Sequence, residues 1–367
     1  MAEDLDAWRQ EIRGIDSEII RITARRMELA LKIGQYKADN RLPVKDFRVE
    51  KEIVERSRSM AASLGLAPDF IEDLMTLLMG HSVHEQNKLH QARRQLADSQ
   101  LKDVLIIGGL GRMGKWFSQY FQSIGFQVSI NDINADDIPD SYARHVDLKK
   151  DLNRYEIILL ACPLTEAAAL LQTLAEQKPQ GMIIETSSLK SPIIPVLKTL
   201  QAEGLKIASI HPMFGPDTDL LLDKNILICK AEGLCSNEAA TLYFHSTSAN
   251  LVTIDLQSHD EIMLSTLGLA HLINLLFGIT LSEQNISVKD GRETGGATFL
   301  HQTHSAEALL SENHELYFDI QALNPHRSKL YEDLQKVLSK LTNLVETGDR
   351  SGFLALFDKT RHYFQDL

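Results

Sequence analysis

Residues 104–114, VLIIGGLGRMG, decide the fold of the central part of this 367-residue chain. A short apolar run, typical of a buried strand, passes directly into Gly109, Gly111 and Gly114, which are spaced as GxGxxG. A helical pattern follows at once. Small residues at these positions let the backbone approach a pyrophosphate, whose charge the amides at the helix N-terminus stabilise. The motif therefore predicts a dinucleotide site in an α/β fold.

Asp132 ends the second apolar run, roughly 20 residues after the glycines, where dinucleotide sites place an acid on the adenosine ribose hydroxyls. Its charge would repel a 2′-phosphate, and no Arg or Lys follows closely. NAD is therefore favoured over NADP. The alternative is that Asp132 serves only as a turn residue in the sequence NDIN.

Further short apolar runs are separated by helix-like or turn-rich segments, a pattern that predicts a parallel sheet. These runs are VLIIGG, FQVSIND, YEIILLAC, GMIIETSS, KIASIHP and NILICK. From about Ser258 the chain is helical again. We expect three domains: an all-α domain at 1–95, a Rossmann NAD-binding domain at 102–256, and an all-α substrate-binding and dimerisation domain at 257–367.

The N-terminal region predicts one long amphipathic helix, because apolar residues recur at spacings of three and four from Leu5 to Tyr36. Arg26 lies on its apolar face, where an unpaired cation would cost several kcal/mol. Lys37 is nearly three turns further on and faces the same way, about 16 Å along the axis. The two cations could converge on one small anion, although Lys37 alone could equally be a solvated surface charge.

Arg9 lies about 25 Å from Arg26 on a straight helix, so one chain cannot bring both to the same small ligand. A second copy of the helix could supply it. The alternative is that Arg9 is simply a solvated charge. A second helical pattern follows the interruption near Pro43, and Pro68 suits the first turn of a third helix.

This region resembles the all-helical chorismate mutase family, in a register without a gap from about Leu5 to Leu89. The resemblance implies that Arg26, together with Arg9 of a partner subunit, binds the two carboxylates of chorismate. It implies that Ser82 adds a carboxylate contact. The rearrangement to prephenate needs only a compact conformer and donors aimed at developing negative charge, so cationic groups suit it.

The same resemblance implies further roles around the breaking bond. Lys37 and Gln86 would hydrogen-bond the ether oxygen, while Asp46 and Glu50 would orient the substrate hydroxyl. One departure is Val49, where many relatives carry an additional Arg. Weaker carboxylate binding is the expected consequence.

Residues 102 to about 320 resemble the prephenate dehydrogenase family in IIGGLGRMGKWF, ETSSLKSP and SIHPMFGPD. The resemblance implies that His211 accepts a hydrogen bond from the substrate's ring hydroxyl and assists hydride transfer to NAD. Ser188 would hold that hydroxyl and His211 in register. A histidine suits this task because its ordinary pKa leaves it largely neutral at cellular pH.

Two histidines in the C-terminal region, His259 and His271, match histidines of relatives and would contact ligand or serve as core residues. Leu300 stands where relatives carry an Arg that binds a substrate carboxylate. Three nearby residues could replace it by donating to a carboxylate: Arg292, His301 and Gln302. The expected consequence is altered substrate preference or weak dehydrogenase activity.

Composition bounds the remaining possibilities. A net charge of −12 makes nucleic acid a poor partner. The acidic N-terminus lacks a secretory signal, no segment approaches a membrane span, and three scattered cysteines favour a reducing compartment. We expect a cytoplasmic homodimer with NAD as cofactor and no metal.

The leading interpretation is a bifunctional enzyme of tyrosine biosynthesis that rearranges chorismate and then oxidises prephenate. A second enzymatic interpretation is a dehydrogenase that prefers arogenate or another hydroxy acid. A third keeps both folds but makes one of the two regions a ligand-binding regulatory domain.

Overall fold

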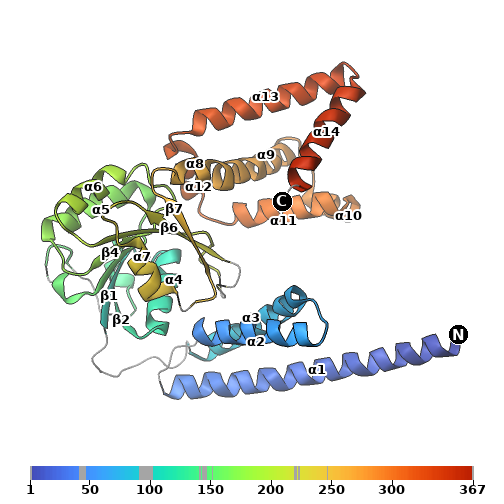
Figure 1. Ribbon diagram of the computed structural model, residues 1–367, viewed down its shortest axis with the longest axis horizontal. Coiled ribbons are helices and arrows are strands. Elements are labelled where there is room, and N and C mark those ends of the chain that lie inside the picture. Colours follow the sequence, from blue (N-terminus) through green and yellow to red (C-terminus); the bar gives the residue numbers. More distant parts are fainter. Residues whose placement is uncertain are drawn as a thin grey trace. The chain divides into compact units, whose positions relative to one another are not determined.

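The structure is a computed structural model that describes residues 2–40, 47–90, 102–139, 142, 147–150, 152–218, 221, 224–245 and 247–365 (Figure 1). The chain divides into two compact units. The first comprises Met1–Ser188 and Ile193–Leu256, and the second comprises Leu189–Pro192 and Gln257–Leu367. The short segment Leu189–Pro192 therefore belongs with the C-terminal helices rather than with the strands that flank it in sequence.

Three helices form the N-terminal part of the first unit: α1 (Ala2–Asp39), α2 (Phe47–Ser63) and α3 (Pro68–His90). The long amphipathic helix expected from the sequence is confirmed, and α3 begins at Pro68 as predicted. α3 packs against both α1 and α2, with Val54 and Met79 buried between them. Every described side chain from Leu5 to Ile22 on α1 is exposed.

A seven-stranded sheet follows, in the order β2-β1-β3-β4-β5-β6-β7. Its strands are β1 (Lys102–Ile107), β2 (Phe126–Asn131), β3 (Ile157–Leu160), β4 (Met182–Glu185), β5 (Ile207–Pro212), β6 (Asn225–Lys230) and β7 (Asn250–Asp255). The first five strands are parallel, as predicted.

The prediction of a wholly parallel sheet is wrong at one edge. β6 runs antiparallel to β5, and β7 pairs parallel to β6. A parallel neighbour requires a crossover, usually a helix, and the described residues between Pro212 and Asn225 form none. β7 was not among the expected strands, because its largely exposed residues lack the long apolar run of a central strand.

Side chains of β1 alternate between two cores on the two faces of the sheet. Val104 and Ile106 join a cluster formed with α4 (Arg112–Ser123), which contributes Trp116, Phe117, Tyr120 and Phe121. Leu105 and Ile107 join a second cluster beneath α5 (Leu164–Gln177) and α6 (Ile194–Ala202). The sheet is thus covered on both faces, which explains its continuous apolar runs.

Short elements complete the first unit: η1 (Ala135–Asp137), η2 (Leu152–Arg154), α7 (Ser236–Ala239) and the π-helical η3 (Ala240–Phe244). The second unit is helical, as expected. Its elements are α8 (His259–Met263), the π-helical η4 (Leu264–Leu269), α9 (Ala270–Glu283), α10 (Val288–Thr294), α11 (Ala297–Leu310), α12 (His314–Leu323), α13 (Arg327–Glu346) and α14 (Arg350–Gln365).

One helical stretch, His259–Glu283, is long and apolar enough to cross a membrane by length and composition, with 17% of its most apolar window buried. The expectation that no segment approaches such a span is therefore wrong on this criterion. The reason is that residues 262–282 contain no charged side chain, and the polar residues His271 and Asn274 interrupt them only weakly.

Candidate active sites

A pocket of about 240 Å³ opens among the N-terminal helices and gathers several residues singled out from the sequence. Arg26 and Lys37 reach it from α1, Glu50 from α2 and Ser82 from α3. The two cations therefore share one face of α1, as their spacing implied. The other residues that line the pocket, Val49 among them, are apolar.

Arg26 is fixed in this pocket by hydrogen bonds to α3. Its Nη1 donates to the Leu78 carbonyl oxygen at 2.8 Å and to Ser82 Oγ at 2.7 Å. Partial burial lowers the pKa of Arg26, which nevertheless stays protonated because an arginine begins so far above neutrality. Neither of these partners carries a charge, so Arg26 presents a positive guanidinium to the pocket.

Three other predicted residues of this site lie elsewhere or cannot be placed. Arg9 is exposed near the start of α1, where it pairs with Asp6 at 3.3 Å and does not line the pocket. Gln86 belongs to α3, about one turn after Ser82, but its side chain lies outside the described residues. Asp46 lies wholly outside them.

The glycine loop after β1 is packed too closely for side chains. Gly108 has φ +77°, and a Cβ there would lie 2.5 Å from the Ala161 carbonyl oxygen. A Cβ on Gly114 would lie 2.0 Å from the Gly108 carbonyl oxygen, so α4 starts pressed against the end of β1. Gly111 caps α4 without a side-chain hydrogen bond, which leaves first-turn amides for an anion. These features fit a dinucleotide pyrophosphate.

Asp132 follows β2 directly and faces this loop. Its Oδ2 accepts a hydrogen bond from the Leu110 amide at 2.9 Å, and its Oδ1 accepts one from the Asn134 amide at 3.2 Å. The second bond is the local turn that the alternative interpretation described. The first ties the carboxylate to the glycine loop, next to the position where the sequence predicts the cofactor's ribose.

The carboxyl ends of β4 and β5 bring the two proposed dehydrogenase residues to one edge of the sheet. Glu185 and Ser209 are register partners, and Ser188 and His211 follow them in sequence. His211 is 4% exposed. The Glu185 carboxylate accepts hydrogen bonds from Ser209 Oγ and, at 2.8 Å, from the Ser187 amide. Ligands bind at this edge in open α/β sheets.

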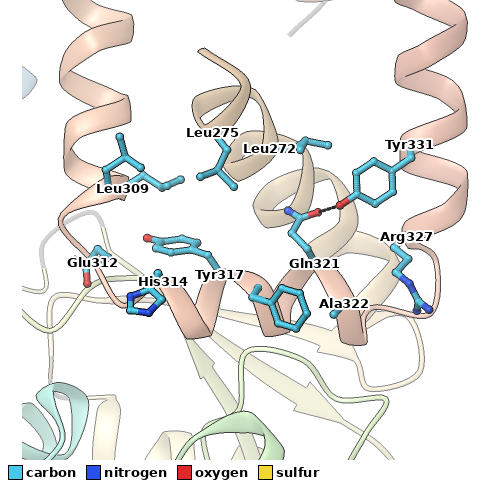
Figure 2. Close-up of a pocket in the computed structure, with 12 residues that line it drawn as sticks. Leu272, Leu275, Leu309, Glu312, His314, Tyr317, Gln321, Ala322, Arg327 and Tyr331 are labelled. Carbon is cyan, nitrogen blue, oxygen red and sulfur yellow. Dashed lines mark hydrogen bonds between the residues drawn. The ribbon is translucent and has the colours of Figure 1, made fainter. Parts of the chain in front are cut away.

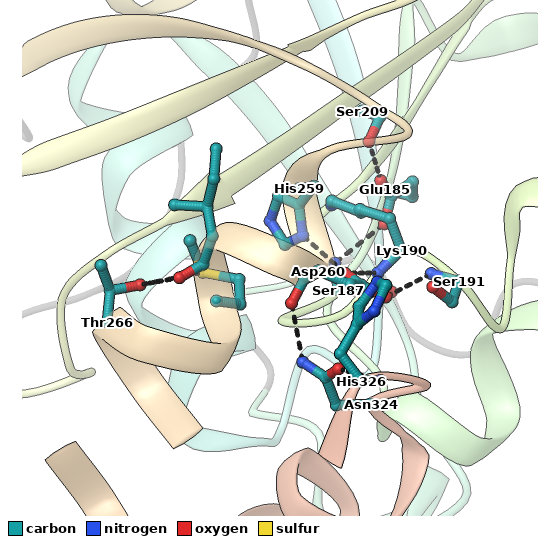
Figure 3. Close-up of polar contacts among 12 residues, drawn as sticks. Glu185, Ser187, Lys190, Ser191, Ser209, His259, Asp260, Thr266, Asn324 and His326 are labelled. Carbon is teal, nitrogen blue, oxygen red and sulfur yellow. Dashed lines mark hydrogen bonds and ion pairs between the residues drawn. The ribbon is translucent and has the colours of Figure 1, made fainter. Parts of the chain in front are cut away.

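In the second unit a buried carboxylate holds the segment Leu189–Pro192 (Figure 3). Asp260 Oδ1 accepts the Lys190 amide at 2.8 Å, and its Oδ2 accepts the Ser191 amide at 2.7 Å. His259 Nδ1 lies 2.7 Å from Asp260 Oδ1. Burial raises the pKa of Asp260, but hydrogen bonds from His259, Ser191 and the Lys190 amide outweigh it and lower that pKa to about 2.

His259 is therefore fully buried and bonded within the core, which favours the structural interpretation of this histidine. His271 is half-buried, and its ring meets Tyr317 edge-on at 4.6 Å between centroids. Burial lowers the pKa of His271 to about 4, so it is neutral at cellular pH. Tyr317 also lines an apolar pocket of about 510 Å³ among the helices of this unit (Figure 2).

Leu300, on α11, is 40% exposed. Of the residues that could replace the missing guanidinium, Arg292 is engaged with the Glu307 carboxylate, and Gln302 Nε2 donates to Asn274 Oδ1 at 2.9 Å. An incoming substrate carboxylate would have to compete with Glu307 for Arg292 and with Asn274 for Gln302.

Two buried residues that organise these sites were missed by sequence reasoning. Asp260 sits in the first turn of α8, where an acid is ordinarily a surface residue favoured by the helix dipole. Trp116 is one of several buried aromatic residues of α4, and nothing in the sequence sets it apart from the others. Their partners are largely backbone groups distant in sequence, which leave no signal in a single sequence.

Comparison with known proteins finds two family models in the first 188 residues and relatives that match the whole chain. The sequence model of chorismate mutase type II matches residues 8–87, and that of the NAD-binding domain of D-isomer specific 2-hydroxyacid dehydrogenases matches residues 75–188. A T-protein of Enterobacter agglomerans is 23% identical over 100% of this chain and 94% of its own. A T-protein of Haemophilus influenzae is 24% identical over 99% and 93%.

A crystal structure of prephenate dehydrogenase from A. aeolicus, in complex with hydroxyphenyl propionate and NAD+, has a similar fold. Its TM-score is 0.59 at 15% identity, and the match covers 74% of this chain and 99% of that one. The expected order of folds, a helical part, a Rossmann sheet and C-terminal helices, is confirmed.

Proposed function

We propose that this chain, which joins a chorismate mutase type II domain to an NAD-dependent dehydrogenase domain, is a bifunctional enzyme of tyrosine biosynthesis. It rearranges chorismate to prephenate and then oxidatively decarboxylates prephenate to 4-hydroxyphenylpyruvate. The observation that carries this proposal is the presence in one chain of a cation-lined pocket and of a dinucleotide-binding sheet. The first reaction makes the substrate of the second.

In the mutase pocket, charge complementarity selects the substrate. Arg26 binds one carboxylate of chorismate, with Ser82 beside it, and Arg9 of a second copy binds the other. Lys37 and Gln86 donate to the ether oxygen, on which negative charge develops as its bond to the ring breaks and the new carbon–carbon bond forms. Glu50 and Asp46 orient the ring hydroxyl. The small volume favours the compact conformer that reacts.

At the dehydrogenase edge, NAD supplies the hydride acceptor. Gly109, Gly111 and Gly114 let the backbone approach its pyrophosphate, and Asp132 receives its ribose hydroxyls. His211 accepts the proton of the ring hydroxyl as the hydride leaves the ring carbon that bears this hydroxyl. Loss of carbon dioxide then makes the ring aromatic, which renders the step effectively irreversible.

Around the substrate, Ser188 holds the reacting hydroxyl toward His211. His271, neutral and half-buried, contributes a substrate contact from the C-terminal helices. We assign the domains to 1–95, 102–256 and 257–367.

The test supplies chorismate and NAD together to the full chain and follows NADH and 4-hydroxyphenylpyruvate. Arg26→Ala should abolish chorismate loss yet leave oxidation of added prephenate unchanged. His211→Asn should slow NADH formation about 100-fold or more and leave the mutase intact. Each variant thus controls for the folding of the other. If either variant retains the parent's rate in its own reaction, the corresponding assignment is wrong.

A homodimer is part of this proposal. The exposed apolar face of α1 supports it, with Trp8, Ile12, Ile15, Ile19 and Ile22 all at least half exposed. Arg9 lies on this same helix and requires a neighbouring chain to reach a substrate. Exposed Ile273, Leu276 and Ile279 on α9 offer a second apolar face. Sedimentation of the full chain tests it, and a monomer at all concentrations would contradict it.

Arogenate is the second candidate substrate of the dehydrogenase. Both acids carry the same two carboxylates, but arogenate has an ammonium group where prephenate has a keto group, so its net charge is less negative. Leu300 and the engagement of Arg292 with Glu307 favour arogenate, because it depends less on a guanidinium for binding. Turnover of prephenate and of arogenate with NAD separates the two. We assign the enzyme to the cytoplasm, with its three cysteines as free thiols.

A further inference from the structure

Helix α4 holds the loop that follows β5 through two of its side chains. Arg112, the first residue of α4, forms an ion pair with the Asp217 carboxylate. Trp116, one turn later, donates from Nε1 to the Thr218 carbonyl oxygen at 2.9 Å. The loop is therefore tied to α4 at two adjacent points.

The indole of Trp116 is locked in place by other rings. It stacks on Tyr120 at 5.4 Å between centroids with an interplanar angle of 5°, and meets Phe117 edge-on at 5.2 Å. On the loop side it packs against Phe214 at 4.9 Å. Trp116 is 4% exposed. Because a close-packed ring cannot swing without displacing its neighbours, its N–H is a donor of fixed direction.

The other side of the loop is held by the sheet. The Met213 amide donates to the Asn225 carbonyl oxygen of β6 at 2.8 Å, and the Thr218 amide closes a turn onto Gly215 at 3.1 Å. His211 stands immediately before this loop, at the end of β5. Its placement at the edge of the sheet thus depends on α4 as well as on β6.

The same helix forms the floor of the dinucleotide site, because its first turn follows the glycine loop and Gly114 is pressed against Gly108. We propose, building on the dehydrogenase function above, that α4 couples occupancy of the dinucleotide site to the position of His211. Trp116 is the main positioning residue. The ion pair of Arg112 with Asp217 is a weaker second tie, since Arg112 is about half exposed and Asp217 largely exposed.

Coupling of this kind is reciprocal: if bound NAD improves binding of the aromatic product, the product improves binding of NAD by the same factor. NAD binding should also protect the loop of residues 213–218 against hydrogen exchange. Both effects should weaken when the tie from Trp116 is removed.

The decisive variant is Trp116→Phe in the full chain. Phenylalanine keeps a ring against Phe214 but has no N–H for the Thr218 carbonyl. We expect kcat for prephenate oxidation to fall at least fivefold, the loss of about one hydrogen bond, with the Kd for NAD unchanged within twofold. The pKa seen in the pH profile of kcat should move, because His211 is displaced; a variant that is only less stable would lose amplitude and keep that pKa.

Two further variants serve as a weaker perturbation and as a control. Asp217→Asn removes only the exposed ion pair and should lower kcat about twofold. Trp8→Phe is the matched control in the other tryptophan of the chain and should leave the dehydrogenase unchanged. It also leaves Trp116 as the sole tryptophan, whose emission should change when NAD binds.

The proposal is overturned if Trp116→Phe keeps the parent's kcat and pH profile, or if NAD protects residues 213–218 equally in parent and variant. Failure of the proposed function is a different outcome. A parent that binds NAD but oxidises neither prephenate nor arogenate would refute that function, while hydrogen exchange and Trp116 emission with NAD alone would still decide the coupling.

Discussion

The buried carboxylate of Asp260 should control how firmly the segment Leu189–Pro192 is held. Replacing it by asparagine keeps its shape but removes its charge. One side-chain oxygen can still accept an amide, whereas the new NH2 group faces the other amide donor. Since Lys190 and Ser191 both donate to this side chain, one of the two amides is left unsatisfied in Asp260→Asn.

The free energy that this substitution should cost follows from the lowered pKa of Asp260. A shift from 3.8 to about 2, at about 1.4 kcal/mol per unit, corresponds to about 2 kcal/mol of favourable interaction with the charged form. The cost of an unsatisfied buried donor, ~1–3 kcal/mol, agrees with it. Local opening of this segment should therefore become about 30-fold more frequent in Asp260→Asn.

Hydrogen exchange of a peptide spanning Leu189–Pro192 measures how often this segment opens. Because the folded-state pKa lies below the unfolded one, the stabilisation is fully present above about pH 4 and is lost as the pH falls from there through about 2. Between pH 5 and 8 the parent should show constant protection after correction for intrinsic rates. NADH formation should slow in the variant, since Ser188 adjoins the loosened segment, while mutase activity stays unchanged.

The neighbouring exposed residue offers a matched control. Glu261→Gln removes a charge from the same turn of α8 without touching the segment, and should leave its exchange unchanged. Exchange of Lys190 and Ser191 that is no faster in Asp260→Asn than in Glu261→Gln, in folded protein, would refute the reasoning.

Three shorter predictions concern the other sites. Val49 lines the mutase pocket and is 46% exposed, so the substitution Val49→Arg adds a second guanidinium there. The KM for chorismate should then fall up to tenfold in steady-state assays. An unchanged or higher KM would show that this position does not face the substrate. Gly114→Ala puts a Cβ 2.0 Å from the Gly108 carbonyl oxygen and should weaken NAD binding at least tenfold by calorimetry, with the mutase retained as folding control. Asp132→Ser removes the charge that repels a 2′-phosphate, and the ratio of kcat/KM for NADP to that for NAD should rise at least tenfold; a constant ratio would exclude Asp132 from cofactor choice.

Much of the fold could be predicted because its signals are local. The glycine motif and the continuous apolar runs of strands buried on both faces identified β1 to β6, and the spacing of apolar residues identified α1. The direction of β6 could not be predicted, since it depends on how the chain returns rather than on its composition. β7 lies at an edge of the sheet, where mostly exposed residues lack an apolar run.

The same contrast holds at the sites. Helix periodicity alone put Arg26 and Lys37 on one face, and the structure brings both to one pocket. Trp116 and Asp260 could not be singled out, because they act through carbonyls and amides of residues far away in sequence, and backbone groups are the same in every residue.

α1 runs for 38 residues, about 57 Å, yet the described side chains of its first half touch little else in the chain. Most of the stability of a helix in a protein comes from packing of its apolar face, and the first half of α1 leaves that face exposed. Its ellipticity should therefore depend on protein concentration. At high dilution that half of the helix would melt, taking Arg9 with it, and chorismate turnover per molecule would decline in parallel.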